Sequence, residues 1–317
     1  MDDQPGLSVV VPVYKSEAML RLLVDRLRAV CVQLAQPFEI ILVNDGSPDG
    51  SWGQITALAQ EDSNVRGIDL MRNYGQHNAL LCGVRAAQFG VIVTLDDDLQ
   101  NPPEEIPLLL AKLDEGYEVV YGAPRQGAHG RYRRVASWLT KVVLQHGMGA
   151  ATATSVSSFR AFRTPVREAF SSYNSPDVSL DVLLTWGTSR FSSVSVHHAA
   201  RVSGASNYTF TKLVTHAFSL VTGFSLLPLQ LATLLGFLFT LIGLAIAAYV
   251  LLNFLVRGGT VPGFTFLACL IAIFSGVQLF ALGMIGEYLA RVHFRTMGRQ
   301  SYIIRAHNDL DARSLDG

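Results

Sequence analysis

Short apolar runs alternate with longer amphipathic segments over the first 125 residues of the chain. Runs rich in valine, isoleucine and leucine begin near residues 7, 38, 65, 91 and 117, as buried strands do. The segments between them are interpreted as helices, at 17–34, 51–60, 77–89 and 102–116. Regular alternation of strands and helices predicts an α/β fold, with a mostly parallel sheet and helices on both of its faces.

The pattern changes in the last third of the chain, where charged residues disappear. Residues 213–256 and 258–286 contain no Asp, Glu, Lys or Arg. A membrane-spanning helix needs about 20 apolar residues, and a soluble helix of this length normally carries charges on one face. Two transmembrane helices are therefore predicted at about 227–256 and 264–289, with a pair of buried core helices as the alternative.

The residues around these two helices predict how the chain is organised. Arg291, Arg295, Arg299 and Arg305 follow the second helix, whereas Arg257 is alone in the turn between the helices. The positive-inside rule then places both ends of the chain in the cytoplasm. Aromatic and aliphatic residues at helical spacing predict an amphipathic interfacial helix over 206–226, with a core helix as the alternative. We expect a cytosolic domain (1–205), this juxtamembrane helix, a transmembrane hairpin (227–289) and a basic cytosolic tail (290–317).

Composition agrees with a membrane protein and excludes several other classes. Half of the 317 residues are hydrophobic and only 16% are charged. The 25 basic and 25 acidic residues balance, so no basic surface for nucleic acid is expected. Cys31, Cys82 and Cys269 lie far apart and fit no disulfide or metal-binding spacing. The glycine-rich signatures of dinucleotide-binding enzymes and P-loop enzymes do not occur in the sequence.

Polar side chains follow the first four predicted strands. They are Tyr14 and Glu17, the Asn-Asp-Gly-Ser segment at 44–47, Arg72 and Asn73, and the aspartates at 96–98. Ligands of such sheets bind at the carboxyl ends of the strands, so these clusters should line one rim. Side chains alternate along a strand, which would put Asp96, Asp98 and Gln100 on one side. This oxygen-only set predicts Mg²⁺ or Mn²⁺ shared with phosphates, and an exposed acidic loop is the alternative.

Five motifs together resemble the family 2 glycosyltransferases of GT-A fold. They are VVVPVY, NDGSPDGS, RNYGQHNALLCG, TLDDDLQNPPEEIP and LDEGYEVVYG. The later features, including the two predicted transmembrane helices, resemble the polyprenyl-phosphate branch, and the resemblance covers nearly the whole chain. It implies a bacterial inner-membrane enzyme that transfers a sugar from a UDP-sugar to undecaprenyl phosphate with inversion. It further implies a Mg²⁺ or Mn²⁺ cofactor, a role in cell-envelope glycan or lipid A modification, and a homo-tetramer.

The resemblance also implies roles for individual residues. The donor nucleotide-sugar would be bound by Pro12, Tyr14, Glu17, Asp45, Asp96, Asp97 and Arg201. The metal would be held by Asp96, Asp98 and Gln100, and the catalytic residues would be Asp96, Asp98 and Arg160. The acceptor phosphate would be bound by Arg125, Arg134, Ser137 and Arg160. Asn207 stands where the family usually has a lysine, which removes one positive charge from a phosphate-rich site.

Two other functions are compatible with parts of this pattern. A processive polysaccharide synthase of the same fold normally carries a Q-x-x-R-W motif, which this sequence lacks. A non-catalytic membrane scaffold would not need the intact Asp96-x-Asp98 motif followed by Gln100. The sequence therefore favours a transferase, and it does not indicate which sugar is transferred.

Overall fold

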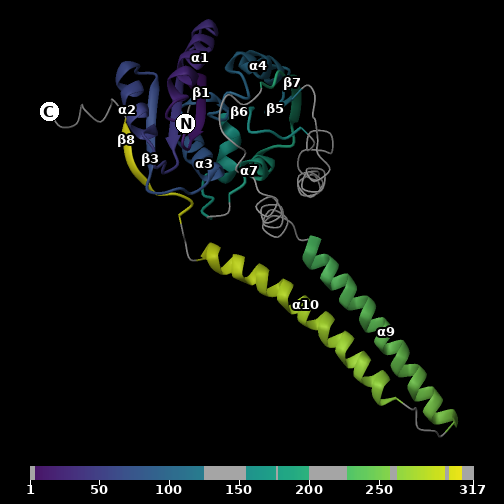
Figure 1. Ribbon diagram of the computed structural model, residues 1–317. Coiled ribbons are helices and arrows are strands. Elements are labelled where there is room, and N and C mark those ends of the chain that lie inside the picture. Colours follow the sequence, from purple (N-terminus) through teal and green to yellow (C-terminus); the bar gives the residue numbers. More distant parts are fainter. Residues whose placement is uncertain are drawn as a thin grey trace. The chain divides into compact units, whose positions relative to one another are not determined.

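The computed structural model describes residues 4–124, 155–175, 178–199, 227–257, 263–296 and 300–308. The chain divides into two compact units. One unit comprises Met1–Val214 together with Gly298–Gly317, and the other comprises Thr215–Met297. The first unit holds a sheet with its helices, and the second holds two long helices (Figure 1).

An eight-stranded sheet forms the centre of the first unit, in the order β7-β5-β6-β4-β1-β2-β3-β8. The strands are β1 (Gln4–Val13), β2 (Phe38–Asn44), β3 (Val65–Leu70), β4 (Phe89–Thr94), β5 (Val119–Pro124), β6 (Arg160–Arg163), β7 (Phe191–Val196) and β8 (Ile304–Asn308). Strand β6 is antiparallel to β4 and β5, β8 is antiparallel to β3, and the other neighbours are parallel. The predicted mostly parallel sheet is confirmed, and its two reversed strands were not predicted.

Helices cover both faces of this sheet. They are α1 (Leu20–Gln33), α2 (Ser51–Glu61), α3 (Gln76–Ala86), α4 (Ile106–Asp114) and α7 (Leu180–Gly187), with 3-10 helices η1 (Pro103–Glu105) and η2 (Thr164–Phe170). Residues of α1, α2 and α4 share one buried cluster with Val9 and Val11 of β1. Helix α3 packs on the other face, where a Cβ on Gly83 would lie 2.4 Å from Val10 Cγ1. Because β1 is covered on both faces, its sequence is a nearly continuous apolar run and does not alternate between apolar and polar residues.

The segment after the second long helix differs from the predicted basic tail. Residues 304–308 form β8, whose His307 lies opposite Ile68 of β3. Arg305 Nη2 donates to the carbonyl oxygen of Met71 (2.7 Å), and its Nη1 lies 3.4 Å from Asp69 Oδ2. One arginine of the predicted tail, Arg305, is therefore part of the sheet edge.

The second unit consists of α9 (Leu227–Arg257) and α10 (Phe264–Thr296). Phe239 and Phe274 form an edge-to-face contact between these helices, with ring centroids 6.0 Å apart. The helices were predicted at 227–256 and 264–289, so α10 continues seven residues beyond its predicted end. The predicted interfacial helix at 206–226 lies outside the described residues.

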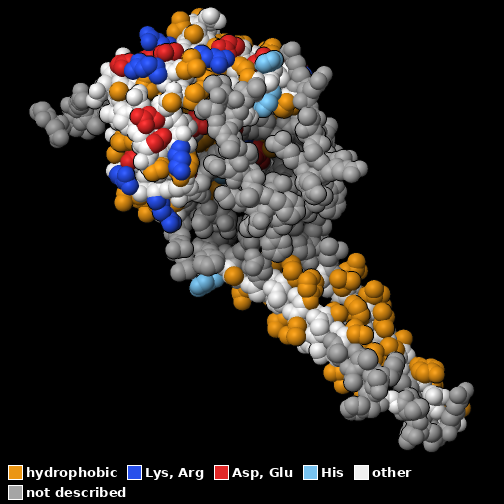
Figure 2. All heavy atoms as spheres, viewed as in Figure 1, with side chains coloured by type: hydrophobic (Ala, Val, Ile, Leu, Met, Phe, Trp, Pro, Cys, Tyr) orange, Lys and Arg blue, Asp and Glu red, His pale blue; other side chains and the backbone are white. Residues whose placement is uncertain are grey.

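Apolar side chains lie along the visible face of both long helices (Figure 2). Leu255 is 70% exposed on α9 and Leu279 is 68% exposed on α10. Within the described residues, one stretch, Ile273–Ala290, is long and apolar enough to cross a membrane, with a mean hydropathy of 1.4. Helix α9 contains a shorter apolar stretch, Ala232–Ile246. The prediction of two membrane spans therefore stays a prediction.

Candidate functional site

The predicted polar clusters gather at one edge of the sheet, where β1, β2 and β4 end. Strand β1 lies between the other two, and all three are parallel. Tyr14 N donates to Asp97 Oδ2 (3.2 Å), which joins the loop after β1 to the loop after β4. Lys15 N donates to Ser47 Oγ (3.0 Å), which joins the loop after β1 to the loop after β2. We call residues 14–17, 44–47 and 96–100 the aspartate rim.

The chain turns directly after β4 instead of continuing as a strand through the aspartates. Strand β4 ends at Thr94, and Leu99 has a left-handed φ of 56° with a side chain that is 1% exposed. Asp98 Oδ1 accepts a hydrogen bond from the backbone nitrogen of Gln100 (3.1 Å). Asp96, Asp98 and Gln100 were predicted to lie on one side because side chains alternate along a strand. That premise is wrong, because alternation requires an extended backbone and the strand ends at Thr94.

Asp96 is held by side chains from two other elements. Gln76 Nε2, at the start of α3, donates to Oδ1 at 2.5 Å, and Ser158 Oγ, two residues before β6, donates to Oδ2 at 2.5 Å. These contacts orient both oxygens of the carboxylate. Neither donor was predicted. Gln76 belongs to the RNYGQH motif that supported the family resemblance, whereas Ser158 carried no sequence signal beyond its serine-rich segment.

Asp97 faces the loop that follows β1. Its Oδ2 accepts hydrogen bonds from Ser16 Oγ and from the backbone nitrogen of Tyr14. The pKa of Asp97 is raised to about 6, mainly by burial and also by the charges of Asp96 and Asp98, while the bonds from Ser16 and Tyr14 partly oppose the rise. In the structure Asp97 connects two loops of the rim, and its predicted contact with the donor stays a prediction.

The other predicted donor-site residues divide into buried and exposed groups. Asp45 is 3% exposed and accepts hydrogen bonds from Tyr74 N (2.7 Å) and Gly75 N (2.9 Å). Burial raises the pKa of Asp45, and these two bonds partly oppose the rise. Pro12 is buried within β1, whereas Tyr14 and Glu17 are exposed. Asp45 thus fixes the loop before α3, while Tyr14 and Glu17 are accessible at the rim.

Arg160 has different contacts from those predicted for it. Its side chain is 1% exposed and forms an ion pair with Asp181, in the first turn of α7. Its Nε donates to Thr94 Oγ1 at the end of β4 (3.1 Å), and the Tyr121 hydroxyl donates to Asp181 Oδ1 (3.0 Å). The structure shows a buried charge that links β4, β6 and α7, and the predicted contact of Arg160 with the acceptor phosphate stays a prediction. Asp181 was not predicted, because nothing in the local sequence marks it.

The oxygens of Asp96, Asp98 and Gln100 are the predicted ligands of a divalent cation. Within the described residues, no group of three or more His, Cys, Asp or Glu side chains is arranged as a metal site. Two carboxylates and one amide oxygen nevertheless suit a hard cation, and a carboxylate oxygen that accepts one hydrogen bond keeps further lone pairs. The chemistry of this donor set therefore fits Mg²⁺ or Mn²⁺.

Four predicted site residues lie outside the described part of the chain. They are Arg125, Arg134, Ser137 and Arg201. Asn207, which replaces a family lysine, also lies outside it. Three of the four arginines predicted to contact phosphate groups therefore lie outside the described residues, and Arg160 is the fourth.

Comparisons with known proteins test the family resemblance directly. The family model described as "Glycosyl transferase family 2" matches residues 8–169. The chain is 36% identical over 303 residues to undecaprenyl-phosphate 4-deoxy-4-formamido-L-arabinose transferase of Yersinia enterocolitica, covering 94% of this chain and 92% of the relative. The enzyme of the same name from Yersinia pestis is 35% identical over the same shares.

A solved structure agrees with the fold. Glucosyl-3-phosphoglycerate synthase from Mycobacterium tuberculosis, in complex with Mn²⁺ and UDP-glucose, matches with a TM-score of 0.51 at 19% identity. The match covers 69% of this chain and 77% of that chain. At this identity the likeness supports the fold alone, an α/β GT-A-like sheet with flanking helices. The family match and the 36% identical relative show that the chain belongs to glycosyl transferase family 2 and is a glycosyltransferase.

Proposed function

We propose that this glycosyltransferase moves a sugar from a UDP-sugar to the phosphate of a polyprenol, namely undecaprenyl phosphate, at the bacterial inner membrane. The observation that carries the proposal is the similarity over 94% of the chain to enzymes whose names specify undecaprenyl phosphate. That coverage extends beyond the α/β unit into the two long helices, as a lipid acceptor would require.

The proposed reaction forms a bond from an acceptor phosphate oxygen to the anomeric carbon of the sugar and breaks the bond from that carbon to UDP. Attack from the opposite face inverts the anomeric configuration. The acceptor phosphate is already anionic near neutral pH, so positioning and electrostatics suffice without a strong general base. Asp96, Asp98 and Gln100 would hold a divalent cation, which stabilises the charge that develops on the departing diphosphate.

The described residues support this role by fixing the aspartate rim in advance. Gln76 and Ser158 orient Asp96, and Ser16 and the Tyr14 backbone hold Asp97. Such preorganisation lowers the reorganisation needed when charge develops. Tyr14, with Pro12 beneath it in β1, would border the base of the donor.

Charges for the phosphate groups would come from segments outside the described residues. The proposal assigns Arg125, Arg134 and Ser137 to the acceptor phosphate and Arg201 to the donor diphosphate. Arginine suits this task because its planar guanidinium can contact two phosphate oxygens at once. Arg160 enters the proposal as a positioning residue, since its ion pair with Asp181 joins β6 and α7 beside Thr94.

Strand β8 supports a specific membrane topology. It follows α10 in the sequence and pairs with β3, which precedes α9. Both ends of the helical pair thus connect to one sheet, so the chain crosses a membrane an even number of times or not at all. If Ile273–Ala290 spans the membrane, a second crossing is needed, and the proposal assigns it to α9. The proposal is a two-span hairpin with the sheet and both ends on the cytoplasmic side, as the arginines after residue 290 indicate.

A panel of radiolabelled UDP-sugars, incubated with the purified protein, undecaprenyl phosphate and Mn²⁺, tests the proposal. We expect label in the lipid fraction with one sugar and stoichiometric release of UDP. Release of UMP would indicate transfer of a phosphosugar, and label in a polymer would indicate a processive synthase. Either result, or no transfer with any sugar, would contradict the proposal.

A further inference from the structure

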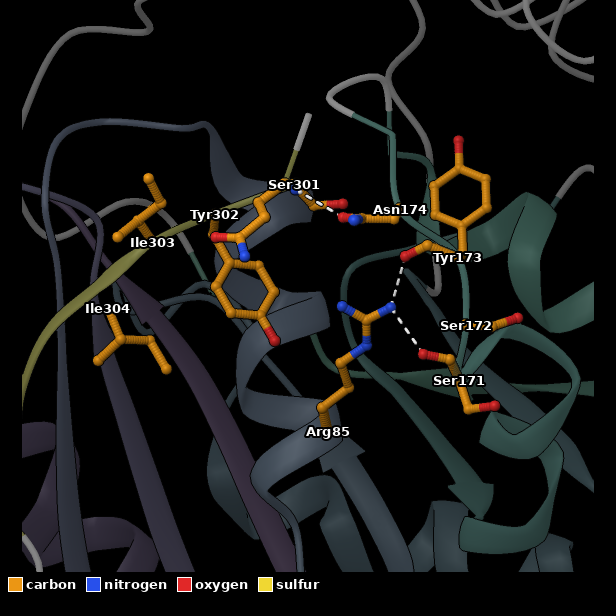
Figure 3. A pocket seen from close by; sticks show the side chains of 10 residues that line it. Arg85, Ser171, Ser172, Tyr173, Asn174, Ser301, Tyr302, Ile303 and Ile304 are labelled. Carbon is orange, nitrogen blue, oxygen red and sulfur yellow. Dashed lines mark hydrogen bonds between the residues drawn. The ribbon is translucent and has the colours of Figure 1, made fainter. Parts of the chain in front are cut away.

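A cavity of about 450 Å³ lies beside α3, away from the aspartate rim. It is formed by Arg85 near the end of α3, by the loop after η2 at 171–174, and by residues 300–304 that lead into β8 (Figure 3). Helix α3 begins at Gln76, which contacts Asp96, and Arg85 is the penultimate residue of this helix. At 1.5 Å per residue, their Cα atoms are roughly 14 Å apart along the helix. The cavity volume falls within the usual range of small-molecule sites.

The lining of this cavity carries one positive charge. Among the described residues that line it, Arg85 is the charged one, and no carboxylate is present. Hydroxyl and amide groups accompany the guanidinium, from Ser171, Ser172, Asn174, Gln300 and Tyr302. A cation surrounded by neutral hydrogen-bond donors favours an anionic ligand, because nothing in this lining repels it.

The Arg85 guanidinium has donor capacity left for such a ligand. Its Nη2 donates to the carbonyl oxygens of Ser171 (3.0 Å) and Tyr173 (2.5 Å). Its Nε is buried and has no hydrogen-bond partner among the described residues. Figure 3 shows the guanidinium directed into the space between Tyr302 and the 171–174 loop. An arginine has five N–H donors, so the guanidinium has donors beyond those that Nη2 uses.

Two segments far apart in the sequence are locked together to form the walls. Ser301, which is 2% exposed, donates from Oγ to Ser175 O (2.8 Å) and accepts from Ser175 N (3.2 Å). Ser301 N donates to Asn174 Oδ1 (3.2 Å), so the Asn174 amide oxygen is engaged and its NH₂ group is the part that can donate to a ligand. The cavity is thus held by a fixed hydrogen-bonded frame.

We propose that this cavity binds a phosphate group through Arg85, the Asn174 amide and the surrounding hydroxyls. Arginine and neutral donors are the groups that recognise phosphate oxygens in proteins. Two sources supply the same chemistry, a soluble phosphate compound and the headgroup of an anionic phospholipid. The site is separate from the rim that would hold the donor diphosphate, and its lining has no carboxylate to hold a divalent cation, so the phosphate would bind without one.

The test uses the full-length protein in neutral detergent with EDTA, at constant ionic strength. Unfolding temperature is followed while inorganic phosphate is added in one arm and dihexanoyl phosphatidic acid in the other. A ligand that binds the folded state raises this temperature with a saturation curve that yields an apparent Kd. Dihexanoyl phosphatidylcholine and chloride serve as ligand controls.

Three variants assign the signal to the cavity. Arg85→Gln removes the charge. Asn174→Asp keeps the side-chain shape and the oxygen that Ser301 N uses, but places a carboxylate beside Arg85, so it remains informative if Arg85→Gln folds poorly. Gln60→Glu adds the same charge on the exposed surface of α2 as a matched control.

We expect saturable binding by the wild type, an apparent Kd at least about tenfold higher in Asn174→Asp and in folded Arg85→Gln, and an unchanged Kd in Gln60→Glu. Binding of inorganic phosphate identifies a soluble ligand, and binding of phosphatidic acid alone identifies a lipid headgroup. The proposal is overturned if neither compound binds, or if Asn174→Asp binds as tightly as the wild type.

Discussion

Three consecutive aspartates, Asp96 to Asp98, have three different sets of contacts. Asp96 is oriented by Gln76 and Ser158, Asp97 accepts bonds from the loop after β1, and Asp98 accepts a bond from Gln100 N. Like charges this close repel by a few kcal/mol in a partly buried site. The turn after Thr94 relieves part of that repulsion, because it sends the three carboxylates to different partners.

Asp98→Asn should lower transfer by about 100-fold or more, the scale of losing a principal electrostatic stabiliser of the transition state. The reason is that Asp98 would help to hold the cation that stabilises the charge on the departing diphosphate. EDTA should abolish transfer, and Mn²⁺ or Mg²⁺ should restore it. The assay is lipid labelling, with Asp25→Asn on the exposed side of α1 as the control. Full activity in EDTA would remove the metal assignment.

Asp97 should make stability depend on pH. Its pKa is about 6 in the folded protein, against an ordinary value of 3.8 for an aspartate. The folded state therefore binds more protons than the unfolded state between these values, and stability falls as pH rises through this window. Relative to Asp97→Asn, the wild type should lose up to about 3 kcal/mol between pH 4 and pH 7, from about 1.4 kcal/mol per pKa unit.

The measurement for Asp97 is the unfolding temperature of both proteins across that pH range, with EDTA present throughout. Parallel curves for the wild type and Asp97→Asn would show that burial does not perturb this carboxyl group. A gap that widens toward acidic pH, with the wild type falling below the variant, would reverse the sign of the effect.

At the scale of elements, strand β6 carries two ion pairs of contrasting environment. Arg160 pairs with Asp181 of α7, with side chains 1% and 13% exposed. Arg163 pairs with Asp114 of α4, with side chains 42% and 76% exposed. A buried pair that loses one partner leaves an uncompensated charge, whereas an exposed pair contributes little. The pair of Arg160 with Asp181 should thus contribute more to stability than the pair of Arg163 with Asp114.

Asp181→Asn should therefore lower the free energy of unfolding by about 3–5 kcal/mol, whereas Asp114→Asn should cost less than about 1 kcal/mol. Chemical denaturation of the two variants in detergent measures both values. Equal losses would mean that the Arg160 charge is accessible to water. In that case Arg160 would return as a candidate for direct contact with the acceptor phosphate, detectable as a raised acceptor KM in Arg160→Ala.

At the scale of the whole molecule, β8 decides which membrane topologies the chain can have. Its antiparallel pairing with β3 joins segments on either side of the two long helices, and the contact from Arg305 to Asp69 spans 236 residues. A single crossing would place β8 and β3 on opposite sides of the membrane. The proposed hairpin satisfies this constraint, and the predicted homo-tetramer remains a prediction about the same assembly.

Reporter fusions should show this topology directly. A fluorescent protein fused after Gly317 should fluoresce, as it does in the cytoplasm, and alkaline phosphatase fused after Arg257 should be active, as it is in the periplasm. The physical reason is that the arginines after residue 290 favour the cytoplasmic side. Inactive alkaline phosphatase after Arg257, or a fluorescent protein after Gly317 that does not fluoresce, would contradict the hairpin.

The sequence by itself determined the features that rest on local periodicity. Apolar runs and amphipathic segments specified the strands from β1 to β5 and the helices between them, because burial imposes its period on neighbouring residues. The absence of charge over 213–256 and 258–286 specified two long apolar helices. Polar residues after each strand specified the rim, because parallel strands end at one edge.

Only the tertiary structure decided which distant groups meet. The donors to Asp96, the pairing of Arg160 with Asp181 and the return of β8 to β3 join residues 20 to more than 200 positions apart. Short segments such as Arg160–Arg163 and Ile304–Asn308 have too few residues for a periodic signal. Their strand character depends on a partner already in the sheet, so it arises from the folded chain and not from local sequence.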